Sequence, residues 1–308
     1  MKTLITYLIG ICLSAAVFAS DNLTIIIPNS PGGPSDLMGR ALVQTLSQKR
    51  SVIVTNKAGA NGIIGSNYMS ALPPDGNNIY VSGYGILLMP VLSNADGVQY
   101  TLDSLVPVAS LASMPMVLVV SENFPANNFD EFVQEIKKNP NKHSVGIPNI
   151  RSGMQAADVF KPTGVEPNII NYKGESQQLT DLMSKDLSIA VITAAGAKKY
   201  VDSKHIKAIA ILDTRKWPYM PGVSPVTDSY PAANKNLMSS AWWGVFVPAG
   251  TSSTVIQSLN TQINQALADP TVLEIFKTLS CQAEPMSVAQ VTEFHKKQIS
   301  IYKKAVSQ

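Results

Sequence analysis

Cysteine and histidine are scarce in this chain of 308 residues, which contains two cysteines and three histidines. Cys12 lies in an apolar N-terminal segment that we expect to be removed, so Cys281 is left alone and cannot form an internal disulfide. We interpret Cys281 as a small residue near a helix end rather than a reactive thiol. His143, His205 and His295 are far apart and lack metal-ligand spacing with cysteines or carboxylates. The sequence therefore predicts no metal site and no cofactor.

Charge and catalytic motifs are also sparse. Only 15% of residues are charged, and 24 basic against 21 acidic side chains give a net charge of +3 without a basic run, which argues against nucleic acid as a partner. The sequence has no G-x-S-x-G nucleophile elbow and no phosphate-binding P-loop. We therefore predict that the protein is not an enzyme. The alternative is a hydrolase that uses Ser35 or Ser152, for which a distant histidine would have to approach in the fold.

Long apolar runs are confined to the start of the chain. Residues 1–19 have the pattern of a secretory signal peptide, with Lys2 before an apolar stretch from Leu4 to Val17 and small residues up to Ala19. We expect cleavage after Ala19 and a mature protein in the periplasm. A membrane anchor is the alternative, but the run is short for a span.

Short strands and helices alternate along the rest of the chain, which predicts a mainly parallel sheet covered by helices. The expected strands are 23–28, 51–55, 78–82, 116–121, 143–147, 168–171, 187–193, 205–212 and 241–248. The expected helices include 62–72, 152–161, 174–184 and 195–203, with two more after residue 252. We predict two α/β lobes, one formed by 20–120 and 241–308 and the other by 121–240, with a ligand in the cleft between them.

The junction IIIPNSPGGPSDLMGR at 25–40 has the pattern of a strand, a tight turn and a helix. A helix N-terminus offers unpaired N–H groups and a positive dipole end, both of which favour a bound anion. Because an ionised carboxylate would repel such a ligand, we expect Asp36 to cap the helix or brace the loop. This junction predicts the capture of a small anion.

Four motifs, in order, resemble those of one family. They are PGGPSD at 31–36, NKAGANGIIGSNYMSALPPDG at 56–76, NYKGESQQLTDLMSKD at 171–186 and WWGVFVPAGT at 242–251. Together they are similar to motifs of the periplasmic receptors of tripartite tricarboxylate transporters, the Bug-type receptors. The resemblance implies a two-lobed α/β fold of the type II periplasmic-binding-protein (Venus flytrap) class, with mixed sheets flanked by helices. It further implies that the protein binds a small carboxylate and delivers it to a two-subunit membrane permease. We expect the receptor to be a monomer.

The resemblance and the ends of the expected strands together give a set of candidate ligand-binding residues. They are Asn29, Ser30, Pro31, Gly32, Gly33, Pro34, Ser35, Asp36, Ser82, Gly83, Tyr84, Asn149, Ile150, Arg151, Ser152, Tyr172 and Thr193. Trp242 and Trp243 follow one another in a strand, so one should face the core and the other the cleft.

The second ligand loop departs from the family pattern. The chain has PNIRSGM at 148–154, where the family favours small polar residues. Arg151 either forms a bidentate contact with a ligand carboxylate or lies exposed on the loop. Ser188 stands where the family has an acidic residue, which disfavours an amino acid as ligand. Mono-, di- and tricarboxylates and aromatic acids remain open, as does a receptor that reports to a membrane sensor instead of a transporter.

Overall fold

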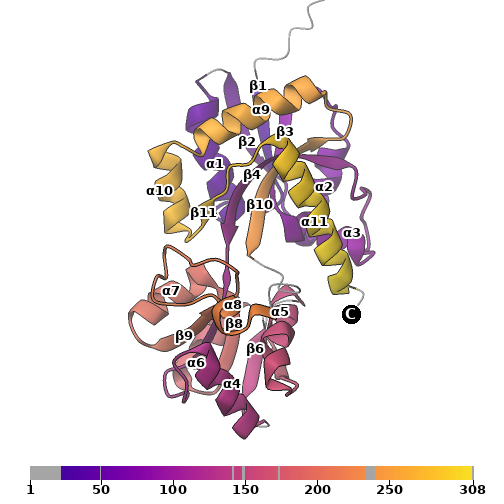
Figure 1. Ribbon diagram of the computed structural model, residues 1–308. Coiled ribbons are helices and arrows are strands. Elements are labelled where there is room, and N and C mark those ends of the chain that lie inside the picture. Colours follow the sequence, from indigo (N-terminus) through magenta and orange to yellow (C-terminus); the bar gives the residue numbers. More distant parts are fainter. Residues whose placement is uncertain are drawn as a thin grey trace, which may run out of the picture.

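The protein folds into two lobes, each a mixed sheet flanked by helices (Figure 1). A computed structural model describes residues 22–48, 50–140, 142–147, 150–172, 174–232 and 240–306. The signal segment at 1–19 lies outside the described residues. Among the described residues, no helix has the length and apolar character needed to cross a membrane.

The first lobe is built on a six-stranded sheet. Its order is β11 (Gln282–Ala283), β4 (Leu105–Met114), β10 (Ala241–Pro248), β3 (Asn78–Gly83), β1 (Asn22–Ile27) and β2 (Ser51–Asn56). β1 runs parallel to both β2 and β3, whereas β10 is antiparallel to both β3 and β4. The sequence pattern predicted mainly parallel pairing, but β10 enters from the second lobe and therefore runs against its neighbours.

The second lobe is built on a five-stranded sheet. Its order is β7 (Asn168–Asn171), β6 (Ser144–Ile147), β8 (Ile189–Thr193), β5 (Met116–Ser121) and β9 (Ile206–Ile211). β6 is parallel to β7 and β8, and β5 is antiparallel to β8 and β9. The central strands β5 and β8 are buried on both faces, as expected for a sheet covered by helices, whereas the edge strand β7 is exposed along its length.

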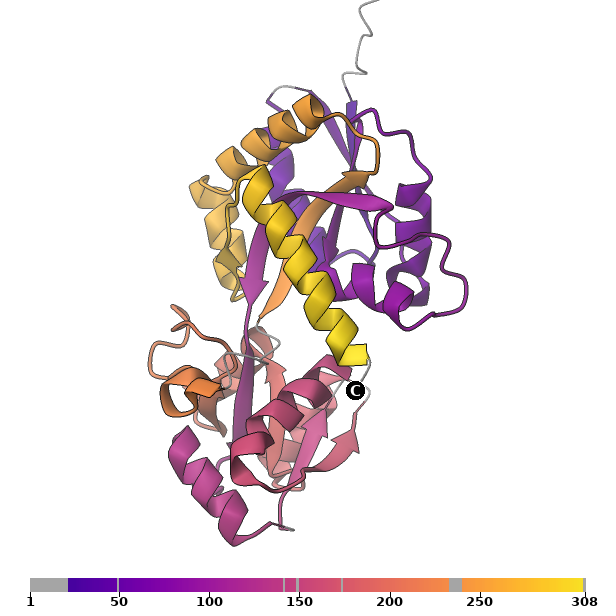
Figure 2. The ribbon, with the colours of Figure 1, turned by 45° about the vertical axis from the view of Figure 1, so that its right-hand side comes forward.

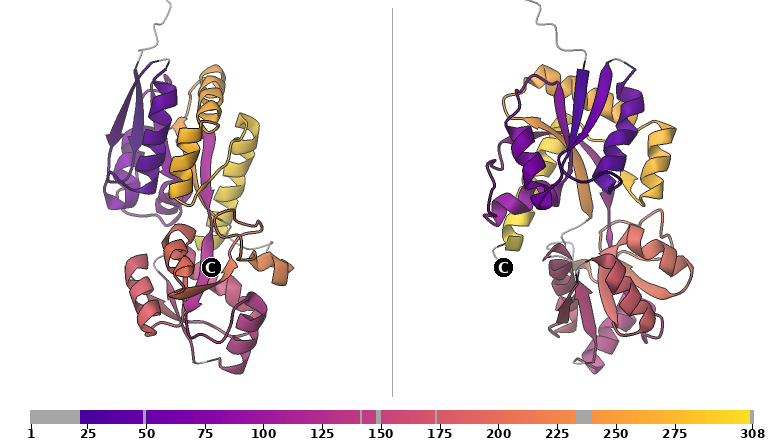
Figure 3. Two further views of the ribbon diagram at one scale, coloured as in Figure 1. Left: turned by 90° about the vertical axis from the view of Figure 1, so that its left-hand side faces the viewer. Right: turned by 180° about the vertical axis from the view of Figure 1, so that it is seen from behind.

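Helices cover both sheets (Figures 2 and 3). In the first lobe they are α1 (Pro34–Leu46), η1 (Ala60–Gly62), α2 (Ile63–Ser70), α3 (Tyr84–Leu92), α9 (Ser253–Ala266), α10 (Pro270–Thr278) and α11 (Val288–Val306). In the second lobe they are α4 (Phe129–Lys138), α5 (Ile150–Phe160), η2 (Lys161–Thr163), α6 (Glu175–Ser184), α7 (Ala194–Asp202) and α8 (Val226–Ser229). The C-terminal helices pack on the first sheet, with α9 and α11 both contacting β4.

The chain first crosses between the lobes at Pro115, where β4 ends and β5 begins. The sequence analysis placed this boundary after residue 120, and the structure corrects it. β5 pairs with β8 and β9 along its whole length, so the run 116–121 belongs to the second sheet. β4 was not expected as a strand, because Pro107 and several small residues weaken its apolar pattern.

The segment after β9 anchors the second lobe to the first. The guanidinium of Arg215 donates from Nη1 to Glu284 Oε1 at 2.6 Å and from Nη2 to Ser113 Oγ at 3.2 Å, and both acceptors belong to the first lobe. Its central carbon also lies 5.7 Å from the ring centre of Trp242, at the start of β10. Arg215 therefore ties the returning chain to three strands or loops beside the crossing.

Candidate functional site

Helix N-termini from both lobes meet at the crossing between the lobes. β1 and β3 are parallel neighbours, so the turns that lead into α1 and α3 leave the same edge of the first sheet. Gly83, at the end of β3, pairs with Trp243, near the start of β10, and this places that edge beside the crossing. On the second lobe, Ala194 N at the start of α7 donates to Pro115 O at 3.0 Å. The carboxyl edges of the two sheets therefore face each other (Figure 3), the arrangement in which α/β proteins bind ligands.

Asp36 braces the β1–α1 loop from inside. Its side chain is 2% exposed, and Oδ2 accepts from Gly32 N at 2.9 Å and from Arg40 Nε at 2.9 Å. Its other oxygen accepts from Asn56 Nδ2 at 2.9 Å, and the same amide nitrogen donates to Asn29 O at 2.9 Å. Burial alone would raise the pKa of Asp36, but these bonds outweigh it and hold that pKa below its ordinary value. Both oxygens of the Asp36 carboxylate therefore accept hydrogen bonds from the protein itself and brace the loop, as the sequence analysis expected.

The start of α1 is left without a side-chain cap. Gly33 is the N-cap residue and Pro34 is the first helical residue. Neither has a side-chain oxygen that could accept a hydrogen bond from the N–H groups of the first turn. Gly32 has φ +89°, a left-handed conformation that favours glycine, and a Cβ at this residue would meet no atom within 4 Å. The loop is exposed at residues 30–32, whereas Ser35 and Asp36 are buried at the positive helix end, where no side chain caps the first turn.

A buried contact joins this helix start to the neighbouring strands. Trp243 Nε1 donates to Ser35 Oγ at 3.2 Å, and Ser35 is 2% exposed. A Cβ on Gly83 would lie 3.5 Å from the same indole nitrogen. Ser35, Gly83 and Trp243 therefore form one group at the crossing. The sequence analysis named Trp243 but could not assign its face.

The remaining first-lobe candidates are buried more deeply. Ser82 is fully buried, and its Oγ donates to Gly83 O at 3.2 Å. Tyr84 is 1% exposed and packs edge-on against Phe246 and Phe294, so its ring belongs to an aromatic cluster under α11. Burial raises the pKa of its hydroxyl. Tyr84 contributes to this region through the start of α3 and not through an exposed ring.

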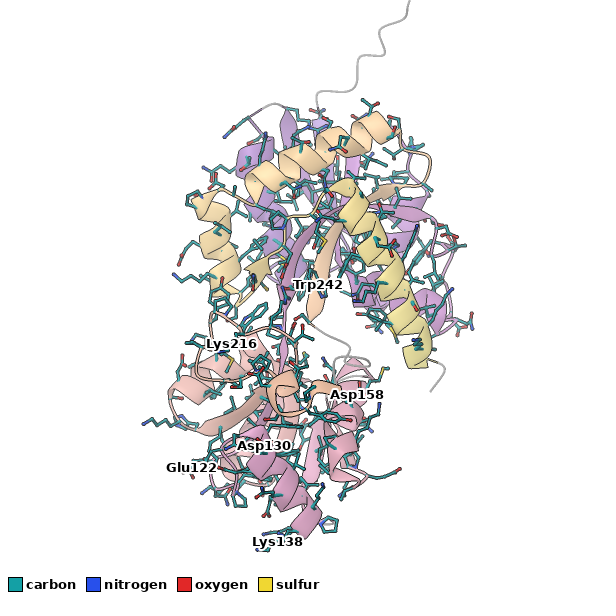
Figure 4. All side chains as sticks on the ribbon, in the orientation of Figure 1. Glu122, Asp130, Lys138, Asp158, Lys216 and Trp242 are labelled. Carbon is teal, nitrogen blue, oxygen red and sulfur yellow. The ribbon has the colours of Figure 1, made fainter. Side chains whose placement is uncertain are left out.

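The two tryptophans of β10 belong to different buried clusters, as expected for opposite faces of a strand, and both are only 8% exposed. Trp242 packs against Phe294 with ring centres 4.4 Å apart, and it lies at the end of β10 nearest the second lobe (Figure 4). Met154, from α5 of the second lobe, packs against the same aromatic cluster. One side of the space between the lobes therefore has an apolar wall.

On the second lobe, Tyr172 and Thr193 are held by neighbouring acidic side chains. Tyr172 donates its hydroxyl to Asp181 Oδ2 at 2.8 Å, and burial together with this carboxylate raises its pKa to about 12. Thr193 donates Oγ1 to Glu175 Oε2 at 2.8 Å and caps α7 by accepting from Gly196 N at 3.1 Å. Both side chains lie at the carboxyl ends of strands, at the edge of the second lobe that faces the first, and are fixed there by these bonds. The sequence analysis did not identify Glu175 or Asn56 as part of this site.

The second ligand loop is only partly described. Asn149 lies outside the described residues, and the side chains of Ile150 and Arg151 do as well. Ser152 is fully buried in the first turns of α5.

The printed contacts of the three histidines are with residues other than Ser35. His143 Nε2 is 2.9 Å from Glu135 Oε1 at α4. Nδ1 of His205 is 2.7 Å from Ser203 Oγ after α7. His295 sits in the aromatic cluster with Tyr84, where burial lowers its pKa to about 4. The hydroxyl of Ser35 accepts a hydrogen bond from the indole of Trp243.

Comparison with protein families gives a match over most of the chain. The model of the tripartite tricarboxylate transporter family receptors matches residues 38–308. BugT of Bordetella pertussis is 29% identical over 272 residues, which are 86% of this chain and 82% of BugT.

Solved structures share the fold. A tripartite tricarboxylate-type (TctC) solute-binding protein from Polaromonas, determined without ligand, has a TM-score of 0.80 at 20% identity, covering 93% of this chain and 98% of that one. MatC of Rhodopseudomonas palustris with bound malate has a TM-score of 0.68 at 21% identity, covering 92% and 98%. Rpa4515 of R. palustris with adipate has a TM-score of 0.71 at 19% identity, covering 93% and 96%.

Proposed function

Because this chain belongs to the tripartite tricarboxylate transporter receptor family, we propose that it is a periplasmic solute-binding receptor for a small organic carboxylate. The observation that carries this proposal is the uncapped start of α1, held open by Asp36 at the edge of the first lobe that faces the second. A carboxylate placed there would complete the hydrogen bonds of the first turn and meet the positive end of the helix dipole.

The charge balance of the loop supports an anionic ligand. The carboxylate of Asp36, in the first turn of this helix, is already bonded to Gly32, Arg40 and Asn56, so its charge is offset within the protein. The related structures with malate and adipate hold dicarboxylates, which agrees in ligand class with such a site. The apolar wall formed by Trp242 and Met154 suits the carbon skeleton of such an acid.

Binding would work by closure of the lobes. A ligand that touches the start of α1 and the second ligand loop at 147–153 bridges the two lobes and stabilises the closed arrangement. The closed receptor, secreted by removal of residues 1–19 and acting as a monomer, would then deliver its ligand to a two-subunit membrane permease. If it reported to a membrane sensor instead, uptake of the ligand would not depend on the permease.

A thermal-shift screen of the mature protein against mono-, di- and tricarboxylates tests the proposal. A ligand at about 100 times its dissociation constant should add about 2.7 kcal/mol to the free energy of unfolding. If Arg151 contacts the ligand, Arg151→Ala should weaken binding by about 1.5–3 kcal/mol, the range for a charge-assisted hydrogen bond. Stabilisation by sugars or cations, with none by any carboxylate, would contradict the proposal.

A further inference from the structure

Glu175 places an acidic group of the protein itself at the start of α7. This side chain belongs to the first residue of α6, yet its carboxylate reaches the neighbouring helix. Thr193 donates its backbone N–H to Oε1 at 2.9 Å and its hydroxyl to Oε2 at 2.8 Å. A Cβ on Gly196, in the first turn of α7, would lie only 2.5 Å from Oε2, so the absence of a side chain there makes room for the carboxylate. The start of α7 therefore already holds an anion.

This carboxylate lies on the crossing side of the space between the lobes. Ala194, the first residue of α7, donates to Pro115 O at the crossing. A crevice of about 620 Å³ separates the same helix, at Ala195, from Thr278 and Ser280 at the end of α10 in the first lobe. Lys198, in the second turn of α7, is paired with Asp202 at 2.6 Å. The carboxylate of Glu175 is bonded to Thr193, the residue before Ala194, so its negative charge lies near the crossing at Pro115.

Three other helix starts whose N-cap residues the structure describes differ from that of α7. α1, α3 and α6 begin at Gly33, Gly83 and Gly174, none of which provides a side-chain cap. A ligand carboxylate can use such uncapped N–H groups, but at α7 it would meet the carboxylate of Glu175.

We propose that Glu175 is a specificity-determining residue, because its carboxylate occupies the start of α7 and excludes a second carboxylate of the ligand from the crossing side of the cleft. This inference rests on the proposed function. The receptor then selects acids in which the group beside Glu175 is uncharged or donates a hydrogen bond. The charged end of the ligand is confined to the remaining helix starts.

Isothermal titration with matched pairs of probes tests the inference. The probes are succinate, glutarate and adipate, each compared with its half-amide, which has one negative charge fewer at nearly the same size. In the unmodified protein the half-amide should bind more tightly than the diacid. In Glu175→Gln, the ratio of the two dissociation constants should shift by about tenfold or more toward the diacid, because a like charge a few ångströms away is removed.

Glu166→Gln is the matched control. Glu166 is exposed and precedes β7, so it lies at the edge of the second sheet away from the crossing. The same change of charge there should leave the ratio within about twofold, since exposed charges at such a distance are screened. Glu175→Ser keeps a small polar residue at the first position of α6 and should shift the ratio in the same direction as Glu175→Gln.

Three outcomes separate the claims. A shift toward the diacid in both Glu175 variants, with normal thermal unfolding, supports the inference. An unchanged ratio, or an equal loss of affinity for both probes, overturns it and leaves Glu175 a structural cap of α7. If neither the diacids nor the half-amides bind to the unmodified protein, while other classes of solute do, the proposed function itself fails.

Discussion

Replacing Asp36 tests how the ligand loop is held in place. The substitution Asp36→Ala removes the acceptor for three donors, namely Gly32 N, Arg40 Nε and Asn56 Nδ2. Gly32 would lose the bond that fixes its left-handed conformation, and Asn56 would lose one of its two acceptors. We therefore expect both a loss of stability and a disordered approach to the start of α1.

The size of the effect follows from these contacts. Arg40 is about half exposed, so its ion pair is screened by solvent and we assign it no energy. The bonds from Gly32 and Asn56 are charge-assisted and belong to a side chain that is 2% exposed, so each should contribute about 1–2 kcal/mol. The free energy of unfolding should therefore fall by about 2–4 kcal/mol in Asp36→Ala. Asp36→Asn, which keeps the shape and one acceptor, should lose about half as much.

Acid should abolish the difference in stability between the unmodified protein and Asp36→Asn. The pKa of Asp36 is lower in the folded protein than its ordinary value, so the folded state is stabilised above the unfolded pKa, and this stabilisation is lost as the pH falls through the folded pKa. The difference between the unmodified protein and Asp36→Asn should be constant from about pH 8 to pH 5 and shrink below about pH 4.

Urea unfolding followed by circular dichroism measures these energies, and titration with the best carboxylate from the screen measures binding. Asp130→Ala is the control, because Asp130 also lies in the first turn of a helix but is exposed on α4 (Figure 4). It should cost less than about 1 kcal/mol and leave binding unchanged. An Asp36→Ala protein with unaltered stability and affinity would refute the idea that this carboxylate holds the loop.

Three further substitutions or reactions probe the surroundings. Gly65→Ala places a Cβ 2.8 Å from the backbone of the β1–α1 loop and should lower the free energy of unfolding, measured in urea, by about 1–3 kcal/mol. Gly222→Ala should leave it unchanged, because a Cβ at Gly222 would meet no atom within 4 Å. Arg215→Ala should lower the free energy of unfolding by about 1–2 kcal/mol and broaden the distribution of distances between the lobes in small-angle X-ray scattering. The control is Lys216→Ala, at the exposed neighbouring residue, which should change neither quantity. Equal effects of the two substitutions would argue against the role of Arg215 as an anchor. Cys281 is buried and burial raises its pKa to about 12, so a thiol reagent at pH 8 should label it in guanidinium but not in the native protein; rapid native labelling would contradict this burial.

Much of the fold could be predicted from the sequence because its strands and helices have clear apolar periods. The runs at 116–121, 168–171 and 241–248 coincide with β5, β7 and β10. Asn128 caps α4 by accepting from Glu131 N at 2.9 Å, a bond that the local spacing Asn-x-x-Glu favours. Local patterns of this kind depend on neighbours in the sequence, so they can be read from it directly.

Features that depend on distant contacts were harder to predict. β4 contains Pro107 and small residues and is recognisable only through its pairing with β10. The first crossing falls at Pro115 and not after residue 120, because no change of composition separates β4 from β5. The antiparallel direction of β10 follows from the return of the chain between the lobes, which no local pattern encodes.

The candidate site shows the same division. The uncapped Gly33–Pro34 helix start and the bracing role of Asp36 follow from local rules for helix ends. The bond from Trp243 to Ser35 and the reach of Glu175 to Thr193 join residues that are far apart in sequence or lie on different helices. Asn56 opened one of the four family motifs, and that position was the one available signal of its role.

The most direct test of the central claim is a crystal structure of the mature protein with a carboxylate that stabilises it in the thermal-shift screen. We predict that a carboxylate oxygen of the ligand accepts hydrogen bonds from backbone N–H groups in the first turn of α1, at Ser35 and Asp36, with the second lobe closed over it. A carboxylate bound elsewhere, with those N–H groups facing only water, would contradict the account.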